Sequence, residues 1–452
     1  MILTEEHIIR CHKQKELYRQ IDAFCYRSKN LYNAANYLIS QCSRISRKCR
    51  EGAALEEWEE ELASRVNDAL RQYNASGHHK KLSPVGADNG FIADAYFLSW
   101  YLKTDENYRA MPYATCAQIC LQELCRDWKS FYRSMEAWKK EPASMPGRPR
   151  KPGYKDREKG RNAIVLTYQN IKVDEAGHVI LPRVFGKIKV RARHGNIRQV
   201  RILTSGGKIR VQLMYERKEP EKGKEKETKD GGKQVPGVMA IDLGVGNLMT
   251  LCMSSEAEPV IIDGHAVKSI NQYYNKRRAS LQAAAMKGNG RLQTKRMERL
   301  TEKRNRKIKD CMHKASRKVI DIALQERIGT IVIGSNSGWK QNVKLGNITN
   351  QHFVSIPYKM LTDQIQYKAH LAGIEVKTVR EDYTSGTSFI DGEMPVKENY
   401  DRSRRIHRGL FRSNTGILIN ADVNAAYQIM KCGGYEDYSW PGPEKVTKLK
   451  VS

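Results

Sequence analysis

The first third of the chain repeats apolar residues at helical spacing. Between residues 9 and 144 an apolar side chain returns every three or four positions, which is typical of amphipathic helices. Three stretches show it clearly, with apolar stripes that include Leu17, Ile21 and Cys25, then Leu62, Val66 and Leu70, then Leu121, Leu124 and Trp128. We therefore predict a helical region over 9–144.

The period changes after residues 145–153, where three prolines and two glycines interrupt the helical pattern. Apolar residues then alternate with polar or basic ones in short runs separated by turn residues, at 163–168, 178–181, 186–193, 198–203 and 208–214. This alternation predicts half-buried strands, and their number favours a small antiparallel barrel or sandwich over 145–215. Its basic face is either solvated or in contact with nucleic acid, and the overall charge favours contact.

Residues 216–233 carry seven basic and six acidic side chains and almost no apolar ones. Such a segment buries too little surface to offset the entropy of ordering it. We therefore predict a flexible linker over 216–236.

The remaining chain, 237–434, alternates strands and helices. Apolar runs predict strands at 238–242, 248–253, 260–263, 330–334 and 374–381, and helices at 276–318, 358–371 and 422–431. The first helical segment contains sixteen basic and three acidic residues and is interrupted at 288–290. This element order is that of the RNase H-like α/β fold, in which the first and fourth strands are neighbours.

Three acidic residues lie where such a sheet gathers side chains. Asp242 ends an apolar strand, Glu381 ends another, and Asp422 lies in the first turn of a helix. Carboxylate oxygens are the ligands of magnesium, which activates water and neutralises charge in phosphodiester cleavage. Taken singly, these residues also have structural explanations. Asp422 favours a helix start, for example, and Glu381 could be a surface charge. Together the three predict a catalytic magnesium site.

Composition indicates a polyanionic partner. Lys and Arg number 79 against 50 Asp and Glu, a net charge of +29, and such a field attracts nucleic acid. No apolar run of about 18 residues could span a membrane, and the first residues do not resemble a signal peptide. We expect a cytoplasmic protein with reduced cysteines.

Three cysteines are close in sequence, Cys116, Cys120 and Cys125. A metal cluster is conceivable, but no histidine or second cysteine pair is near them. Their spacing on a helix favours small buried hydrophobic residues.

At two motifs the chain resembles the TnpB family of transposon-encoded RNA-guided nucleases, from which miniature type V CRISPR effectors descend. Residues 237–245 read GVMAIDLGV and residues 420–426 read NADVNAA, with HKAS at 313–316 between them. The resemblance covers most of the chain. It implies a first wedge strand at 1–8, a helical recognition region, a wedge barrel, and a split RuvC nuclease with Asp242 and Asp422 in its active site.

The family usually places its second acidic residue at the end of the fourth strand, where this chain has Gly334. A branch of the family carries Gly-x-Asn-x-x-Trp-Lys-Gln at that point, matched by residues 334–341, and a glutamate before Tyr-Thr-Ser on the next strand. Glu381 fits that position. Asp382 is the weaker candidate, because successive strand residues point to opposite faces.

Many relatives carry a zinc ribbon before the last motif. The corresponding insert, 386–419, contains no cysteine, so no zinc is expected there. It carries a basic run at 402–412, which either contacts the target strand or is a solvated loop. Residues 435–452 are expected to be a C-terminal tail.

The resemblance implies an RNA-guided DNA endonuclease that cleaves target double-stranded DNA beside a short flanking motif. Asp242, Glu381 and Asp422 would hold two magnesium ions, for which manganese would substitute, and the guide would be a transposon-end RNA or a CRISPR RNA. The alternative is a nuclease-silent RNA-guided repressor, suggested by Gly334. The oligomeric state stays open.

Overall fold

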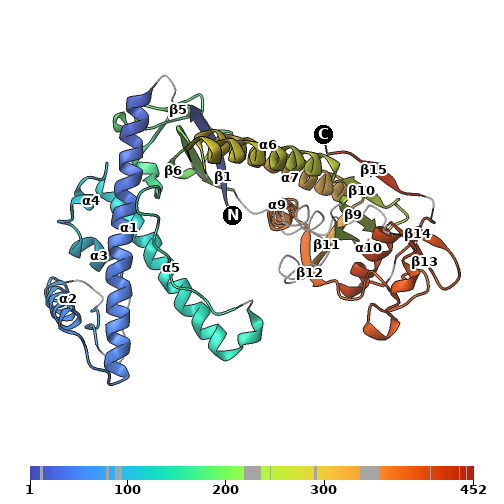
Figure 1. Ribbon diagram of the computed structural model, residues 1–452, viewed down its shortest axis with the longest axis horizontal. Coiled ribbons are helices and arrows are strands. Elements are labelled where there is room, and N and C mark those ends of the chain that lie inside the picture. Colours follow the sequence, from blue (N-terminus) through green and yellow to red (C-terminus); the bar gives the residue numbers. More distant parts are fainter. Residues whose placement is uncertain are drawn as a thin grey trace, which may run out of the picture. The chain divides into compact units, whose positions relative to one another are not determined.

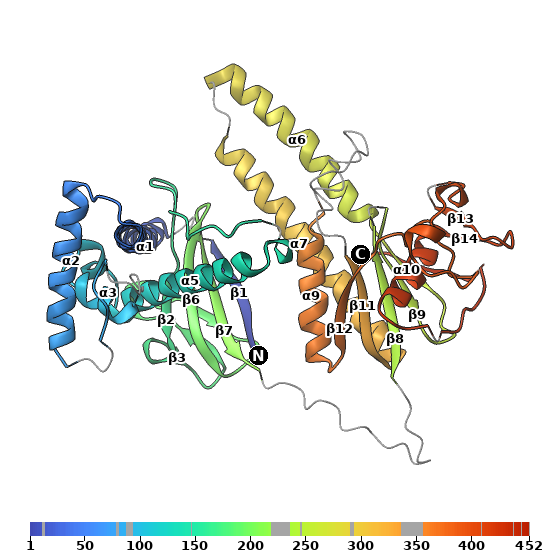
Figure 2. The same ribbon diagram turned by 90° about the horizontal axis from the view of Figure 1, so that it is seen from below.

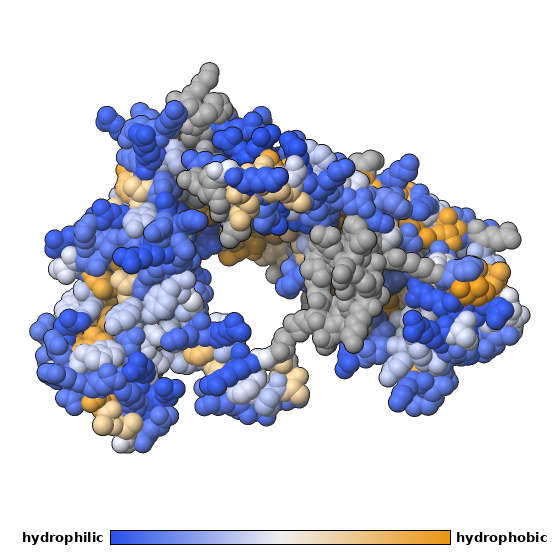
Figure 3. All heavy atoms as spheres, in the orientation of Figure 1, coloured by the Kyte–Doolittle hydropathy of each residue, from blue (hydrophilic) through white to orange (hydrophobic). Residues whose placement is uncertain are grey.

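A computed structural model describes the 452-residue chain except for residues 11–13, 78–80, 87–93, 146, 218–235, 245, 290–292, 336–355, 408, 437, 444 and 452. Three predicted features therefore lie wholly or partly outside the described residues. They are most of the linker, part of the interruption at 288–290, and residues 336–341 of the Gly-x-Asn-x-x-Trp-Lys-Gln match. The chain divides into two compact units, Met1–Lys218 and Glu219–Ser452, each of mixed α/β structure. Hydrophilic residues dominate the visible face of both (Figure 3).

The N-terminal unit contains the predicted helices (Figure 1). They are α1 (Lys15–Arg50), α2 (Glu57–Ala75), α3 (Ala95–Tyr101), α4 (Glu106–Arg109) and α5 (Ala114–Lys140). The predicted stripes face one core, in which Ile21, Val66 and Leu124 are fully buried. Asp94 and Asp105 begin the two short helices by accepting hydrogen bonds from first-turn amides, which stabilises helices too short to persist alone.

The strands of this unit form two antiparallel sheets. One has the order β1-β7-β6-β2 and the other β3-β4-β5. The strands are β1 (Ile2–Arg10), β2 (Ile164–Thr167), β3 (Lys172–Val173), β4 (His178–Ile180), β5 (Lys189–Arg191), β6 (Ile197–Ser205) and β7 (Lys208–Glu216). Within the described residues they do not close into the barrel favoured by the sequence. The buried residues of β6 and β7 pack with α1 and α5 in the same core. Helices therefore cover the apolar face of the sheet, which in a closed barrel would be covered by other strands.

A polar row on α1 holds the segment that leads from α5 to the sheet. Lys29, although only 2 % exposed, donates to a backbone carbonyl of this segment. Asn33 both donates to and accepts from the backbone of one residue, as a strand partner would. The bonds are Lys29 to the Arg157 carbonyl (2.6 Å), Asn33 to Lys155 (2.9 Å each way) and Asn36 to the Pro152 carbonyl (3.1 Å).

The C-terminal unit is built on a six-stranded sheet of order β12-β11-β8-β9-β10-β15 (Figure 2). The strands are β8 (Gly237–Leu243), β9 (Asn247–Met253), β10 (Val260–Asp263), β11 (Ile328–Ser335), β12 (Glu375–Arg380) and β15 (Thr447–Leu449). β8, β9 and β10 pair antiparallel, and β11 and β12 run parallel to β8. The first and fourth strands are neighbours, as predicted. β15, which pairs with β10, was not predicted within 435–452.

Helices cover both faces of this sheet. α6 (His265–Asn289), α7 (Lys295–Gln325) and α9 (Tyr358–Leu371) share one core with Met239, Ile241 and Ile333. α10 (Ala421–Cys432) packs on the other face against Ala240 and Val332. α6 begins well before the predicted start at residue 276. Between β12 and α10 lie the 3-10 turns Lys397–Asn399 and Arg402–Arg404 and the hairpin β13 (Leu410–Arg412) and β14 (Leu418–Asn420). No helix within the described residues is long and apolar enough to cross a membrane.

Candidate active site

Asp242 is directed to the α10 face of the sheet by strand alternation. Ile241 belongs to the core under α7 and α9, whereas Ala240 belongs to the core under α10. Asp242, two residues after Ala240, therefore shares the α10 face. Burial raises the pKa of its carboxyl to about 7, and the negative charge of Asp422 adds to the effect while Arg405 opposes it. Asp242 thus lies in a place where an anion is costly without a cation.

Asp422 is held at the start of α10. The side chain of Asn420 caps this helix by accepting from the amides of Asp422 (2.9 Å) and Val423 (3.3 Å). Asn247, at the start of β9, donates from Nδ2 to Asp422 Oδ2 at 2.8 Å. The Arg405 guanidinium lies 3.6 Å from Asp422 Oδ1. The carboxylate is therefore oriented from one side and charge-paired on the other.

Glu381 follows directly after β12, on the side where Val379 packs toward α10. Gly334, on the neighbouring β11, has no side chain in the way of the glutamate. A Cβ built on Gly334 would lie 2.6 Å from Glu381 Oε2 and 2.5 Å from Ile429 Cδ1. Both distances are too short for real atoms. The Glu381 carboxylate thus occupies the space that a side chain at position 334 would need.

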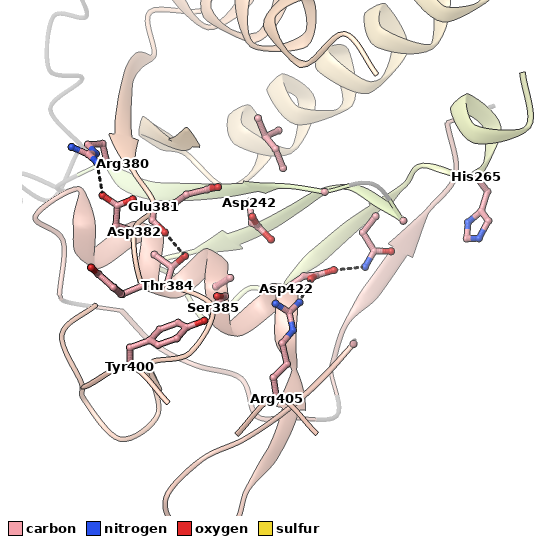
Figure 4. Close-up of a pocket in the computed structure, with 17 residues that line it drawn as sticks. Asp242, His265, Arg380, Glu381, Asp382, Thr384, Ser385, Tyr400, Arg405 and Asp422 are labelled. Atoms are coloured by element: carbon pink, nitrogen blue, oxygen red, sulfur yellow. Dashed lines mark hydrogen bonds and ion pairs between the residues drawn. The ribbon is translucent and has the colours of Figure 1, made fainter. Parts of the chain in front are cut away.

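All three predicted carboxylates line one cavity of about 1030 Å³ (Figure 4). The cavity is polar, and its other walls include Asn247, Arg405 and His265. Asp382, the weaker candidate, also lines it, but its side chain is 41 % exposed and its carboxylate pairs with Arg380 at 3.0 Å. The sequence indicated Arg405 only as part of the basic run 402–412, and it did not indicate Asn247, which begins β9.

Tyr358 braces the turn that follows β8. Its hydroxyl donates to the Gly244 carbonyl at 2.8 Å. Burial raises the pKa of Tyr358, and the charges of Asp242 and Glu381 add to this. The hydroxyl therefore stays protonated and keeps donating, which fixes the backbone just after Asp242.

The carboxylates share the cavity but do not converge on a single point. Across the part of the chain that the structure describes, no three His, Cys, Asp or Glu side chains are grouped so that they could hold a metal ion. The donor chemistry nevertheless fits a hard divalent cation, because the site offers carboxylate oxygens, among them those of the half-buried Asp242, whose pKa is raised.

Cys116, Cys120 and Cys125 lie in the N-terminal core, each at most 3 % exposed. Burial raises the pKa of these thiols to about 12, 11 and 12 respectively. Their interpretation as small buried hydrophobic residues is confirmed.

The cysteine-free insert is tied together by one carboxylate. Glu393 Oε2 accepts from the Ser388 amide (2.8 Å) and from Arg404 (2.6 Å), and its Oε1 accepts from Asn414 (2.9 Å). Its backbone carbonyl accepts from Gln428 on α10 at 3.1 Å. Because Arg404 is anchored in this way, its neighbour Arg405 is presented to the cavity.

Two family models match the chain. One, described as a probable transposase, matches residues 213–340. The other, described as a Cas12f1-like TNB domain, matches residues 358–429. Together they include all three candidate carboxylates, and they confirm the predicted resemblance to TnpB-like miniature type V effectors.

Two curated proteins similar to this chain are CRISPR-associated endodeoxyribonucleases. The chain is 28% identical over 200 residues to a CRISPR-associated endodeoxyribonuclease Cas12f1 of Sulfoacidibacillus thermotolerans, covering 42% of this chain and 44% of that protein. It is 29% identical over 156 residues to the Cas12f1 of Syntrophomonas palmitatica, covering 33% and 30%. The chain thus matches less than half the length of either relative. A solved Cas12f1-sgRNA-target DNA complex is 16% identical with a TM-score of 0.34, over 94% of this chain and 98% of that one, a likeness too distant to carry an argument.

Proposed function

We propose that this chain, which resembles the TnpB-like miniature type V effectors, is an RNA-guided DNA endonuclease whose active site is the cavity that contains Asp242, Glu381 and Asp422. One observation carries the proposal: these carboxylates come from three separate elements, and all line one cavity. The printed names of the curated relatives, endodeoxyribonucleases, support the same activity. The net charge of +29 supports nucleic-acid partners.

Asp242, Glu381 and Asp422 would hold magnesium, with manganese as a substitute. When bound, the metal would activate water and neutralise charge on the transferring phosphate. Asn247 orients Asp422 through its amide. Arg405, released from Asp422, would pair with a phosphate oxygen of the substrate, since a guanidinium matches phosphate geometry. Tyr358 keeps the backbone after Asp242 in place.

The same proposal assigns the parts of the chain. The sheet and helices of 237–434 would be an RNase H-like nuclease of the RuvC type, with the basic helical insert 276–318 and the cysteine-free insert 386–419. Residues 1–8 and 145–215 would form the wedge, residues 9–144 the recognition region, and 216–236 the linker. A transposon-end RNA or a CRISPR RNA would pair with target double-stranded DNA beside a short flanking motif.

A second candidate is an RNA-guided repressor that binds DNA without cutting. Two observations favour it: Gly334 replaces the family's usual acidic residue, and no three metal-ligating side chains are grouped among the residues described. The half-buried Asp242 near Asp422 argues against it, because like charges repel without a metal.

The test begins with sequencing the RNA that co-purifies with the chain, and programming it against a plasmid library with randomised flanks. We expect magnesium-dependent cleavage beside one flanking motif. Asp242→Ala should abolish cleavage while guided binding in a gel shift stays within about twofold, because binding rests on base pairing and backbone contacts elsewhere. Guided binding without cleavage in magnesium or manganese would favour the repressor.

A further inference from the structure

A second pocket lies between α6 and α7, on the C-terminal unit. It measures about 310 Å³, at the lower end of the roughly 300–1,000 Å³ typical of ligand sites. None of its lining residues belongs to the carboxylate cavity. Its walls combine apolar and basic side chains, among them Ile270, Tyr273, Tyr274, Leu300, Lys303 and Lys307.

One wall of this pocket is held by contacts between the two helices. The Tyr274 hydroxyl is 3.0 Å from Thr301 Oγ1 on the facing helix. The Arg304 guanidinium lies 5.6 Å from the Tyr274 ring centroid, and its Nε donates to Asn271 Oδ1 at 2.7 Å. These contacts join α6 to α7 and fix the Tyr274 ring in the wall.

Tyr273 differs from its neighbour. It is 67 % exposed, so a large aromatic ring lies at the pocket with its surface open to solvent. Lys303 and Lys307 are also exposed and are four residues apart, which places both on one face of α7. An open ring beside two cations is a poor surface for an apolar partner and a good one for an aromatic anion.

The surrounding helix strengthens this charge. Residues 295–318 contain eleven Lys or Arg and three Asp or Glu. We propose that the pocket binds one unpaired nucleobase of a single-stranded RNA, with Tyr273 stacked on the base and Lys303 and Lys307 on the flanking phosphates. This rests on the proposed function, because it identifies a contact for the bound RNA. RNA is favoured because protein sites for RNA commonly stack splayed, unpaired bases on aromatic rings.

The direct test needs no substitution. The full chain is crosslinked by ultraviolet light to a ten-nucleotide RNA that carries one 5-iodouridine, and the modified peptide is mapped by mass spectrometry. We expect the crosslink at Tyr273. The same oligonucleotide as DNA, and as a fully paired RNA duplex, should crosslink there far less.

Affinity for the same RNA gives a second readout. Tyr273→Ala should weaken binding by about 5- to 100-fold, the range for loss of one stacked base, whereas Tyr273→Phe should retain it. Lys303→Ala with Lys307→Ala should weaken binding more than the matched pair Arg306→Ala with Lys309→Ala, which removes the same charge from exposed positions outside the pocket.

The outcomes separate this inference from the proposed function. Guided cleavage with no crosslink at Tyr273, or equal binding by Tyr273→Ala and wild type, would overturn the base-binding pocket alone. A stronger Tyr273 crosslink to the DNA oligonucleotide would overturn the assignment to RNA. Absence of any RNA bound to the purified chain would overturn the proposed function itself.

Discussion

The two units treat half-buried acidic side chains in opposite ways. In the N-terminal unit Asp22 is held by Arg161 through two hydrogen bonds (2.9 and 2.8 Å) and accepts from Thr204 at 2.5 Å. Burial would raise the pKa of Asp22, but these bonds outweigh it and hold the pKa below its usual value. In the C-terminal unit burial and Asp422 raise the pKa of Asp242 instead.

The difference separates structural charges from functional ones. Removing a half-buried acid that is hydrogen-bonded to a cation destabilises the fold, because the cation is then left without its counter-charge. An acid such as Asp242, which has a raised pKa and faces both a cavity and a second acid, is arranged for a ligand that the protein does not itself supply. Four experiments would break or sharpen this comparison.

The largest effect is expected at Glu381. Glu381→Ala and Glu381→Gln should each slow cleavage roughly a thousandfold, because losing a charged ligand removes several kcal/mol of transition-state stabilisation. The melting temperature should hardly change, since Glu381 lines the cavity and belongs to neither hydrophobic core of the unit. Single-turnover cleavage on guide-loaded protein measures the rate.

Asp382→Asn is the matched control for Glu381, because this neighbouring acid lines the same cavity but pairs with Arg380. It should cut at the wild-type rate. If Asp382→Asn is inactive and Glu381→Ala is active, the third carboxylate is Asp382 and the argument from Gly334 is wrong.

Asp22 should show the opposite behaviour. Asp22→Ala should cost about 2 kcal/mol, since it leaves Arg161 half-buried without its partner, and this lowers the melting temperature by about 4–8 °C. Calorimetry of the full chain measures the shift. Asp68→Ala removes an exposed pair with Arg71 and should cost at most about 0.5 kcal/mol. If Asp22→Ala and Asp68→Ala lowered the free energy of unfolding equally, the half-buried pair of Asp22 would be worth no more than the exposed pair of Asp68.

Much of the fold and part of the candidate site could be predicted from the sequence. Long apolar stripes predicted α1, α2 and α5, and Asp242 and Asp422 lie in local motifs. Arg405 was not singled out because it reaches Asp422 only through the fold of the insert. The barrel was predicted because alternation reveals a buried sheet face without saying whether strands or helices cover it. β15 has only three residues, too few for a period.

Metal-free protein should report the Asp242 environment through pH. A carboxyl whose pKa rises from its ordinary value to about 7 on folding favours the protonated folded state. Its contribution to stability is full below about pH 4 and is lost as pH rises toward 7. The melting temperature without metal should therefore fall by a few degrees between pH 5 and 8, and magnesium should restore more of it at pH 8.

Asp242→Asn isolates this contribution, because the amide does not titrate. The variant should show a flatter pH profile and a smaller magnesium shift than wild type. An unchanged slope in the variant would assign the pH dependence to other groups and weaken the cation site at Asp242.

The smallest effect is expected from zinc removal. Residues 386–419 contain no cysteine, and Glu393 joins Ser388, Arg404 and Asn414 within this insert. A structural zinc contributes folding energy directly, so its removal would shift melting strongly, whereas here a zinc-selective chelator should shift it by less than about 1 °C. Glu393→Ala should instead loosen the insert, seen as faster proteolysis within 386–419, and slow cleavage by releasing Arg404 and with it Arg405. One zinc per chain in elemental analysis would overturn the expectation of no zinc, and would direct attention to Cys116, Cys120 and Cys125, since residues 386–419 contain no thiolate.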